Sequence, residues 1–378
     1  MGLKLKWILL SGLVALWLIL PPLSLSAYSS QDGVRDGNSP VPAVHFLSQA
    51  LEADALFRQG VAQYQANQFA DAITTWQSAF EHYQQDQNRD RAGMTANAIA
   101  AAQLKLSQYA SAVTWAQQAL AIAEAQADLT AQAQALGNLG IAYLEQGRYW
   151  QAVETYQRSL ELLPTETPTA ATAQLLGLLS NAYGALGNYE RAIALQARSL
   201  EMARALGNTA LAATALSNLG SLHTAVGDYA AAMERYQASL RLARANQDDA
   251  SIAYGLKNLG VVYHALDNLP QAIDYYQQSL AIIRHLSLPA LEAAALSNLG
   301  IAYEDLGDSE QAIALHRQSL AIAEASTEPQ IVATSLNNLS HALLGANRLD
   351  EAETMLQRAI DILVNLRQNL SDLYTISV

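Results

Sequence analysis

The stretch "SNLG" stands at Ser217–Gly220 and again at Ser297–Gly300, and "KNLG" at Lys257–Gly260 lies halfway between them. "GNLG" at Gly137–Gly140 and "NNLS" at Asn337–Ser340 continue the series outward. The phrase therefore returns on a stride of forty residues. Self-similarity at a fixed period of about 20–50 residues is the signature of a repeat architecture, so this stretch decides the class of fold.

Other positions keep the same stride from about residue 51 to residue 367, which makes eight units. Apolar residues recur with helical spacing in both halves of each unit, and the alternation typical of strands is absent. In the fifth unit Gly227 interrupts the pattern, and Asp228 follows as the N-cap of a second helix. One alanine recurs in every second half: Ala72, Ala112, Ala152, Ala192, Ala232, Ala272, Ala312 and Ala352. Each unit is predicted to be a helix, a turn and a second helix.

This pattern resembles the tetratricopeptide repeat (TPR), whose landmarks stand in the third unit at Leu139, Gly140, Tyr143, Ala152, Tyr156, Ser159 and Pro164. Units of that family commonly have about 34 residues. The forty-residue form is similar to kinesin light chain and to the Pins-type adaptors, which also contain an Asn-Leu-Gly phrase. The resemblance implies an all-α fold, an alpha-alpha superhelix (TPR solenoid) of eight helix-turn-helix repeats over residues 51–367.

Packing explains two of the residues in the phrase. Gly140, Gly220, Gly260 and Gly300 remove a side chain where two helices must approach closely, although glycine costs a helix about 1 kcal/mol. The leucines fill the space between helices. Asparagine is a mediocre helix former, and a buried one needs hydrogen-bond partners. Two interpretations stay open: each asparagine bonds to a neighbouring helix or turn, or the asparagines hold the backbone amides of a bound peptide.

The resemblance implies a concave groove that binds a peptide, extended or helical, from a partner protein. Its candidate residues are Asn138, Asn181, Asn218, Thr224, Lys257, Asn258, His264, Asn298, Glu304, Asn338 and His341. The carboxylate-clamp variety of the family needs several converging cations, whereas Lys257 stands nearly alone here. We therefore expect an internal segment of the partner, held by amides and apolar contacts. The alternatives are a structural or oligomerising scaffold that uses the ends or the convex face, and a regulatory arm of an enzyme on another chain.

The N-terminus has the pattern of a secretory signal peptide over residues 1–27: Lys4 and Lys6, an apolar run from Trp7 to Leu20, and small residues before a cleavage site. That run is shorter than the roughly 20 residues of a membrane-spanning helix, and the alternative is an uncleaved anchor. We expect export, with a periplasmic location. Residues 28–50 are rich in Gly, Ser, Asp and Pro and are predicted to be a flexible linker.

Several classes of function are disfavoured. The net charge of −13 and the scattered 21 Lys and Arg residues argue against nucleic-acid binding. There is no cysteine, and the seven histidines lack the spacing of metal ligands. No phosphate loop or nucleophile motif occurs. We expect no enzyme activity, no metal and no cofactor, and contact with a membrane only through an uncleaved N-terminal segment.

The last helix is expected at Asp350–Leu370, with a C-terminal tail over residues 368–378. The stretch "LRQNLSDLYTISV" resembles the joint that follows the repeats in cyanobacterial TPR proteins with a caspase-like CHAT domain. This chain stops there and lacks the cysteine of such a protease. A truncated relative of those proteins and a stand-alone array would both fit the pattern.

Overall fold

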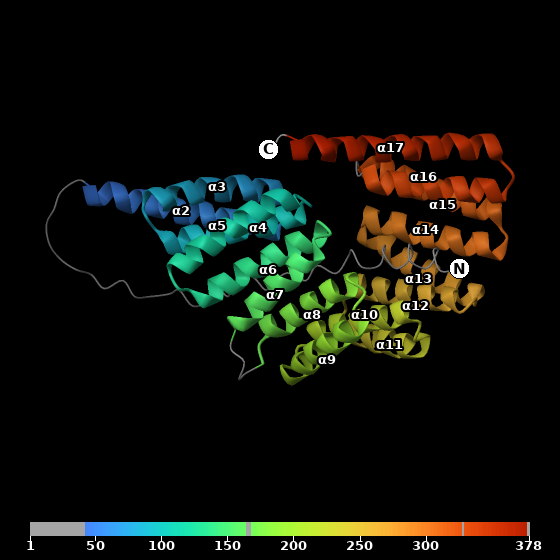
Figure 1. The fold of residues 1–378 in the computed structure, drawn as a ribbon, viewed down its shortest axis with the longest axis horizontal. Helices are drawn as coiled ribbons and strands as arrows, with labels where there is room; N and C mark the ends of the chain where they lie inside the picture. The colour runs from blue at the N-terminus through green and yellow to red at the C-terminus, as the bar shows by residue number, and fades with distance from the viewer. Residues whose placement is uncertain (1–41, 164–167, 327–328, 376–378) are drawn as a thin grey trace. The chain divides into compact units, whose positions relative to one another are not determined.

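The computed structural model describes residues 42–163, 168–326 and 329–375, which form sixteen α-helices and no strand (Figure 1). The helices are α2 Pro42–Gln65, α3 Phe69–Gln85, α4 Arg89–Lys105, α5 Tyr109–Ala125, α6 Leu129–Glu145, α7 Tyr149–Glu161, α8 Ala170–Ala185, α9 Tyr189–Ala205, α10 Thr209–Val226, α11 Tyr229–Ala245, α12 Asp249–Ala265, α13 Leu269–Leu286, α14 Pro289–Leu306, α15 Ser309–Ser326, α16 Pro329–Gly345 and α17 Leu349–Thr375. They make eight pairs, so the predicted all-α fold of eight two-helix repeats is confirmed.

A single residue with a left-handed backbone ends the helices at intervals of twenty residues. These residues are Asn67, Gln87, Ser107, Ala127, Gly147, Gly187, Gly207, Gly227, Gln247, Asp267, Ser287, Gly307 and Asn347. Such a residue turns the chain sharply and lets its N–H bond to a carbonyl of the last helical turn. The sequence signals only the turns that contain glycine. Asp228 caps α11 as predicted, since its side chain accepts a hydrogen bond from the N–H of Ala231 at 3.1 Å.

Within a repeat, the glycine of the first helix lies against a large side chain of the second helix. A Cβ atom added to Gly140 would lie 2.5 Å from Cε1 of Tyr156, and one added to Gly220 would lie 2.6 Å from Cδ1 of Tyr236. Gly60 faces Trp76, Gly260 faces Tyr276 and Gly300 faces His316 at similar separations. These glycines are therefore required by the close approach of the paired helices, as the sequence predicts.

A serine of the second helix binds the first helix in five repeats. The hydroxyls of Ser159, Ser199, Ser239, Ser279 and Ser319 donate to the carbonyls of Ala133, Ala173, Ala213, Ala253 and Ala293 at 2.7–2.9 Å. Each pair is 26 residues apart, and all five serines are buried. A buried hydroxyl must find an acceptor, and this bond fixes the height at which the two helices of a repeat pack.

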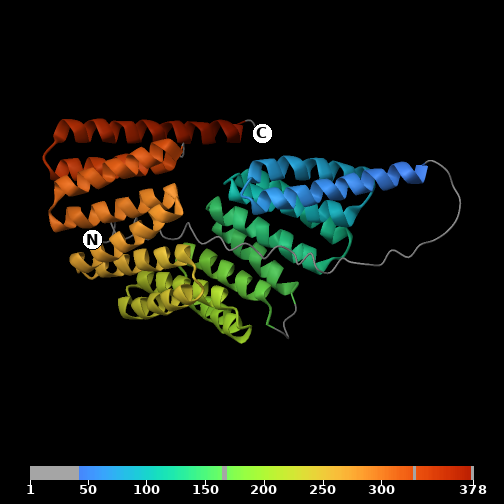
Figure 2. The same cartoon turned by 180° about the vertical axis from the view of Figure 1, so that it is seen from behind.

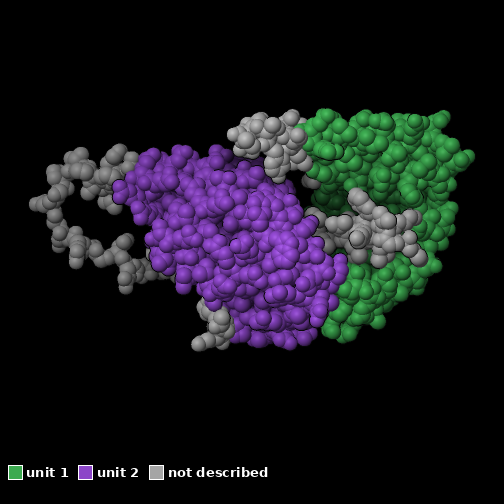
Figure 3. Space-filling model, in the orientation of Figure 1, with its two compact units in different colours: residues 1–17, 212–378 green, residues 18–211 purple. Residues whose placement is uncertain are grey.

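The helices divide into two compact units, which Figure 3 colours separately. One contains residues 42–211 of the described chain and the other contains residues 212–375, with the division inside α10. Within each unit, consecutive helices pack side by side, as the two opposite views in Figures 1 and 2 show. Even-numbered helices of successive repeats, such as α12 and α14 or α14 and α16, also contact each other directly.

Both ends of the array differ from the sequence prediction. Helix α2 begins at Pro42, within the expected linker of residues 28–50, and α17 continues through residues 368–375, which were expected to be a tail. Proline is well accepted at the first position of a helix, so the Pro-containing segment does not prevent the helix from starting there. The expected signal peptide and residues 28–41 lie outside the described residues.

Candidate peptide-binding face

The first helices of residues 212–375 place most of the predicted groove residues on one face. In α12, Lys257 and His264 are seven residues apart and lie on the same side of the helix, whereas Asn258 is rotated from Lys257 by about 100°. Helices α14 and α16 repeat these positions forty residues later. The name "first-helix face" is used here for Asn218, Lys257, Asn258, His264, Asn298, Glu304, Asn338 and His341.

Three polar side chains of this face are buried without a partner. Lys257 is 7% exposed, and Asn258 and Asn298 are each 8% exposed. None of the three forms a hydrogen bond or an ion pair with the described part of the chain. The Nζ of Lys257 lies 5.3 Å from the ring centroid of Tyr254, one turn earlier, and burial lowers the pKa of Lys257 to about 8. The polar atoms of these three side chains are not among the fully buried, unpaired atoms of the described chain, so they still reach solvent and can bond a ligand.

The other titratable members of the first-helix face, His264, Glu304 and His341, already have partners. Nε2 of His264 lies 2.9 Å from Oδ2 of Asp305 on the next first helix. Glu304 bridges two histidines: its Oε1 lies 2.9 Å from Nε2 of His316, and its Oε2 lies 2.8 Å from Nδ1 of His341. His341 is 60% exposed, whereas His316 is fully buried and comes from the second helix α15.

Sequence reasoning missed His316 as a member of this cluster. The signal was present, because His316 stands at the position where three other repeats have Tyr156, Tyr236 and Tyr276 against the glycine. The histidine at this position forms a hydrogen bond with the acidic side chain of Glu304. Asp305, which sequence reasoning did not place in the groove, is the partner of His264.

The remaining candidates behave differently from one another. Asn138 is buried, and its Nδ2 donates to the Oδ1 of Asn97 on the neighbouring first helix at 2.8 Å, which agrees with the structural interpretation. Asn181, Asn218 and Asn338 are half-buried and form no bond with the described residues. Thr224 is a correction: it is buried, and its hydroxyl donates to the carbonyl of Gly220 at 2.8 Å. The hydroxyl group of Thr224 thus donates its hydrogen bond within its own helix.

Neither metal ligands nor a membrane span stand out in the part of the chain that the structure describes. No group of three or more His, Asp or Glu side chains has the arrangement of a metal site there. Of the described helices, none combines the length and the apolar character needed to cross a bilayer.

Comparison with known families identifies the repeats. A family model described as tetratricopeptide repeat matches residues 91–165, 170–245, 248–325 and 291–363, and a second one with that description matches residues 54–86. The chain belongs to the tetratricopeptide repeat family. This confirms the resemblance from which the fold was predicted. No curated protein matches the chain.

Solved structures with a similar fold come from several kinds of TPR protein. A signal transduction ATPase (STAND) protein with a tetratricopeptide repeat sensor from Pyrococcus horikoshii is 14% identical, with a TM-score of 0.60 over 88% of this chain and 51% of that chain. A Rap protein complexed with competence and sporulation factor is 13% identical, with a TM-score of 0.58 over 84% and 99%.

A putative kinesin light chain from Podosopora anserina is 18% identical to this TPR protein, with a TM-score of 0.45 over 52% of this chain and 97% of that chain. At these identities the likeness concerns the fold. The similarity of the C-terminal stretch to CHAT proteins stays a prediction.

Proposed function

We propose that this TPR protein is a non-enzymatic adaptor that binds a peptide segment of a partner protein on its first-helix face. The observation behind the proposal is that Lys257, Asn258 and Asn298 are largely buried, while their polar atoms reach solvent and form no hydrogen bond or ion pair with the described chain. A carboxamide offers a donor and an acceptor, and the lysine offers three donors. The backbone of an extended or helical peptide can meet these groups, and its apolar side chains can pack between them.

The first-helix face favours a peptide over a small polar ligand because its groups are spread over successive repeats. Asn258 and Asn298 occupy equivalent positions on α12 and α14, which contact each other directly. A ligand that meets both must extend along the array. The Rap structure supports a bound factor as a use of this fold, since that protein was crystallised in complex with one.

The periplasm is the proposed place of action. Residues 1–27 have the composition of an export signal, and the partner is then a periplasmic protein or the periplasmic part of a membrane protein. An uncleaved segment would instead anchor the array to the membrane with its repeats on the same side.

A scaffold that associates through its end is the alternative, and the last helix favours it. Leu349, Leu356, Ile360 and Leu363 of α17 are exposed although they recur with helical spacing. An apolar stripe on a terminal helix is a surface that an association can bury. In this alternative a second copy of the chain packs against α17.

A peptide-array experiment with the full chain distinguishes the two. The chain is labelled and applied to random 15-residue peptides, beside an Asn258→Ala/Asn298→Ala variant and the control Gln117→Ala, whose side chain is exposed on α5. Each lost hydrogen bond is worth about 0.5–1.5 kcal/mol, so the double variant should bind selected peptides roughly tenfold more weakly while its melting temperature is kept. Binding that the double variant keeps in full would refute the proposal. A dimer in light scattering that Leu356→Glu dissolves would favour the scaffold.

A further inference from the structure

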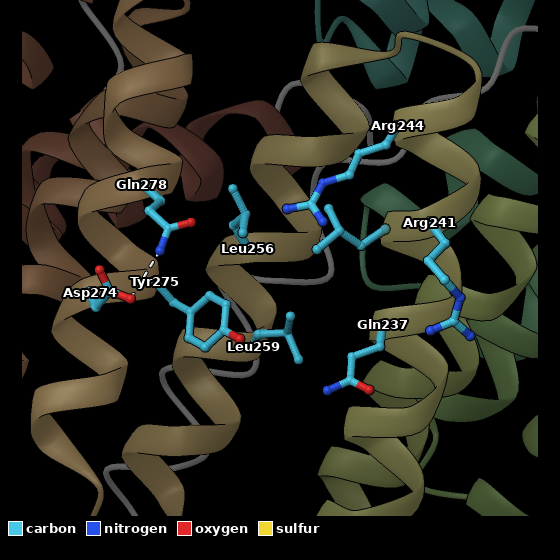
Figure 4. A pocket seen from close by; sticks show the side chains of 9 residues that line it. Gln237, Arg241, Arg244, Leu256, Leu259, Asp274, Tyr275 and Gln278 are labelled. Carbon is cyan, nitrogen blue, oxygen red and sulfur yellow. Dashed lines mark hydrogen bonds between the residues drawn. The ribbon is translucent and has the colours of Figure 1, made fainter.

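A cleft opens between two second helices, on the side of the array formed by α11 and α13 (Figure 4). Its floor consists of Leu240, Leu256 and Leu259, and its volume is about 290 Å³. Arg241 and Arg244 extend from α11 on one wall. On the opposite wall α13 contributes Tyr275 and a hydrogen-bonded pair, in which Nε2 of Gln278 donates to Oδ2 of Asp274 at 2.9 Å. The cleft thus has an apolar floor and a cationic wall.

In three other pairs of successive second helices, a bond joins the same two positions. Glu124 and Arg158 form an ion pair at 3.7 Å between α5 and α7, and Glu324 and Arg358 form one at 2.7 Å between α15 and α17. Arg284 donates to the side-chain oxygen of Gln318 at 3.3 Å between α13 and α15. In each case the two residues are 34 apart.

Arg244 and Gln278 occupy these positions in the cleft between α11 and α13, and they form no bond with each other. Arg244 also lacks the acidic neighbour that its equivalent in the next repeat has. Its equivalent Arg284 pairs with Glu292 at 2.7 Å, whereas the residue forty positions before Glu292 is Ile252. Neither Arg241 nor Arg244 has a carboxylate within ion-pair distance in the described chain. In the described chain Arg204, forty residues before Arg244, likewise faces Ala238 without such a bond, so the cleft is characterised by its two arginines together with its leucine floor.

We propose that this cleft binds the C-terminal residue of a partner chain, with the apolar side chain on the leucine floor and the carboxylate on the guanidinium groups of Arg241 and Arg244. A guanidinium matches a carboxylate through two parallel N–H donors. Asp274 on the facing wall disfavours a doubly charged phosphate. This site lies among second helices and does not rest on the function proposed for the first-helix face.

The volume of the cleft is sufficient for the carboxylate and the apolar side chain of one residue. A cavity of about 150 Å³ is enough to bind benzene, and the cleft is about twice that volume. That volume is enough for one side chain with its backbone carboxylate. An internal Asp or Glu would need a neighbouring residue to supply the apolar group. Gln237 also lines the cleft, and its amide can bond the preceding peptide group of such a ligand.

Two probes that differ only in charge test this site on the full chain. N-acetyl-phenylalanine has the free carboxylate, and N-acetyl-phenylalanine amide does not. Ligand-observed NMR titration should show at least tenfold tighter binding of the acid than of the amide, with inorganic phosphate competing weakly. Equal binding of acid and amide, phosphate binding as tight as that of the acid, or no binding of the acid at 10 mM would each overturn the proposal.

Three variants locate the binding. Arg241→Gln/Arg244→Gln should remove the preference for the acid and leave the weak binding of the amide. The matched control Arg284→Gln changes an arginine that is already paired with Glu292, and it should leave the affinity for the acid unchanged. Gln278→Glu should close the cleft with an ion pair to Arg244, as in the repeats above, and lower the affinity at least fivefold. A preference for the acid that survives the double arginine variant would place the binding elsewhere and overturn the assignment.

Discussion

A Cβ atom added to Gly260 would lie 2.6 Å from Cδ1 of Tyr276, sixteen residues further along the chain. The ring of Tyr276 is 1% exposed and has no free space into which it could retreat. Glycine is therefore required at this position because the space between the two helices has no room for a side chain, and not because the backbone needs the conformational freedom of glycine.

Gly260→Ala should destabilise the fold in spite of the better helix propensity of alanine. Overpacking a core contact costs about 1–3 kcal/mol, against a propensity gain of about 1 kcal/mol. Gly255→Ala in the same helix is the matched control, because its added Cβ would lie an ordinary 3.5 Å from Cδ1 of Leu240. Urea unfolding should show Gly260→Ala below the parent and Gly255→Ala equal to or above it. Equal effects of the two changes would contradict the volume argument.

Ser279→Ala should lower the free energy of unfolding by about 0.5–1.5 kcal/mol. The change removes a buried hydrogen bond of 2.7 Å to the carbonyl of Ala253, and with it the contact that sets the height of α13 against α12. Ser78→Ala on α3 is the control, since that serine is exposed and bonds only within its own helix. The comparison is made by chemical denaturation. A loss no larger than that of the control would show that the serine series does not contribute to stability.

Glu304→Ala and His341→Ala should differ in cost although both break the same cluster. Removal of Glu304 leaves Nε2 of the fully buried His316 without a partner, which costs about 1–3 kcal/mol. Removal of His341 deletes an exposed ion pair and should cost less than about 1 kcal/mol. Thermal melts of the two variants measure the difference. A larger loss for His341→Ala would mean that the buried His316–Glu304 bond is not the stabilising one.

Lys257→Met should stabilise the ligand-free chain at pH 7, and the gain should depend on pH. Burial lowers the pKa of Lys257 from 10.5 to about 8, so at pH 7 the folded state bears the desolvation cost of the charge, roughly 3 kcal/mol. Between pH 8 and 10.5 the unfolded state binds a proton that the folded state has lost, and the stability contributed by Lys257 rises with pH. The advantage of Lys257→Met should therefore shrink across that window. Urea unfolding of both proteins at pH 7, 8, 9 and 10 gives the result, and a constant difference would contradict it.

The sequence by itself determined the fold. The forty-residue stride, the glycine of the phrase and the recurrent alanine place two helices in each unit and bring the paired helices close, because these features depend on periods and volumes that a chain displays directly. The ends of the array were not determined in this way, because nothing in the stride marks where α2 begins or where α17 ends.

Only the tertiary structure decided which polar groups have partners. Asn138 and Asn258 stand at equivalent positions of the same phrase, yet Asn138 meets Asn97 on the neighbouring first helix and Asn258 meets no group of the described chain. Likewise Glu304 is joined to two histidines from two other helices. Whether a hydrogen bond forms is decided by differences of a few tenths of an ångström in the donor–acceptor distance. The bonds of the serine series and of Asn138 join residues that are 26 and 41 positions apart in the sequence. The stride fixes which helices are neighbours, and the individual side chains on them decide which contacts form.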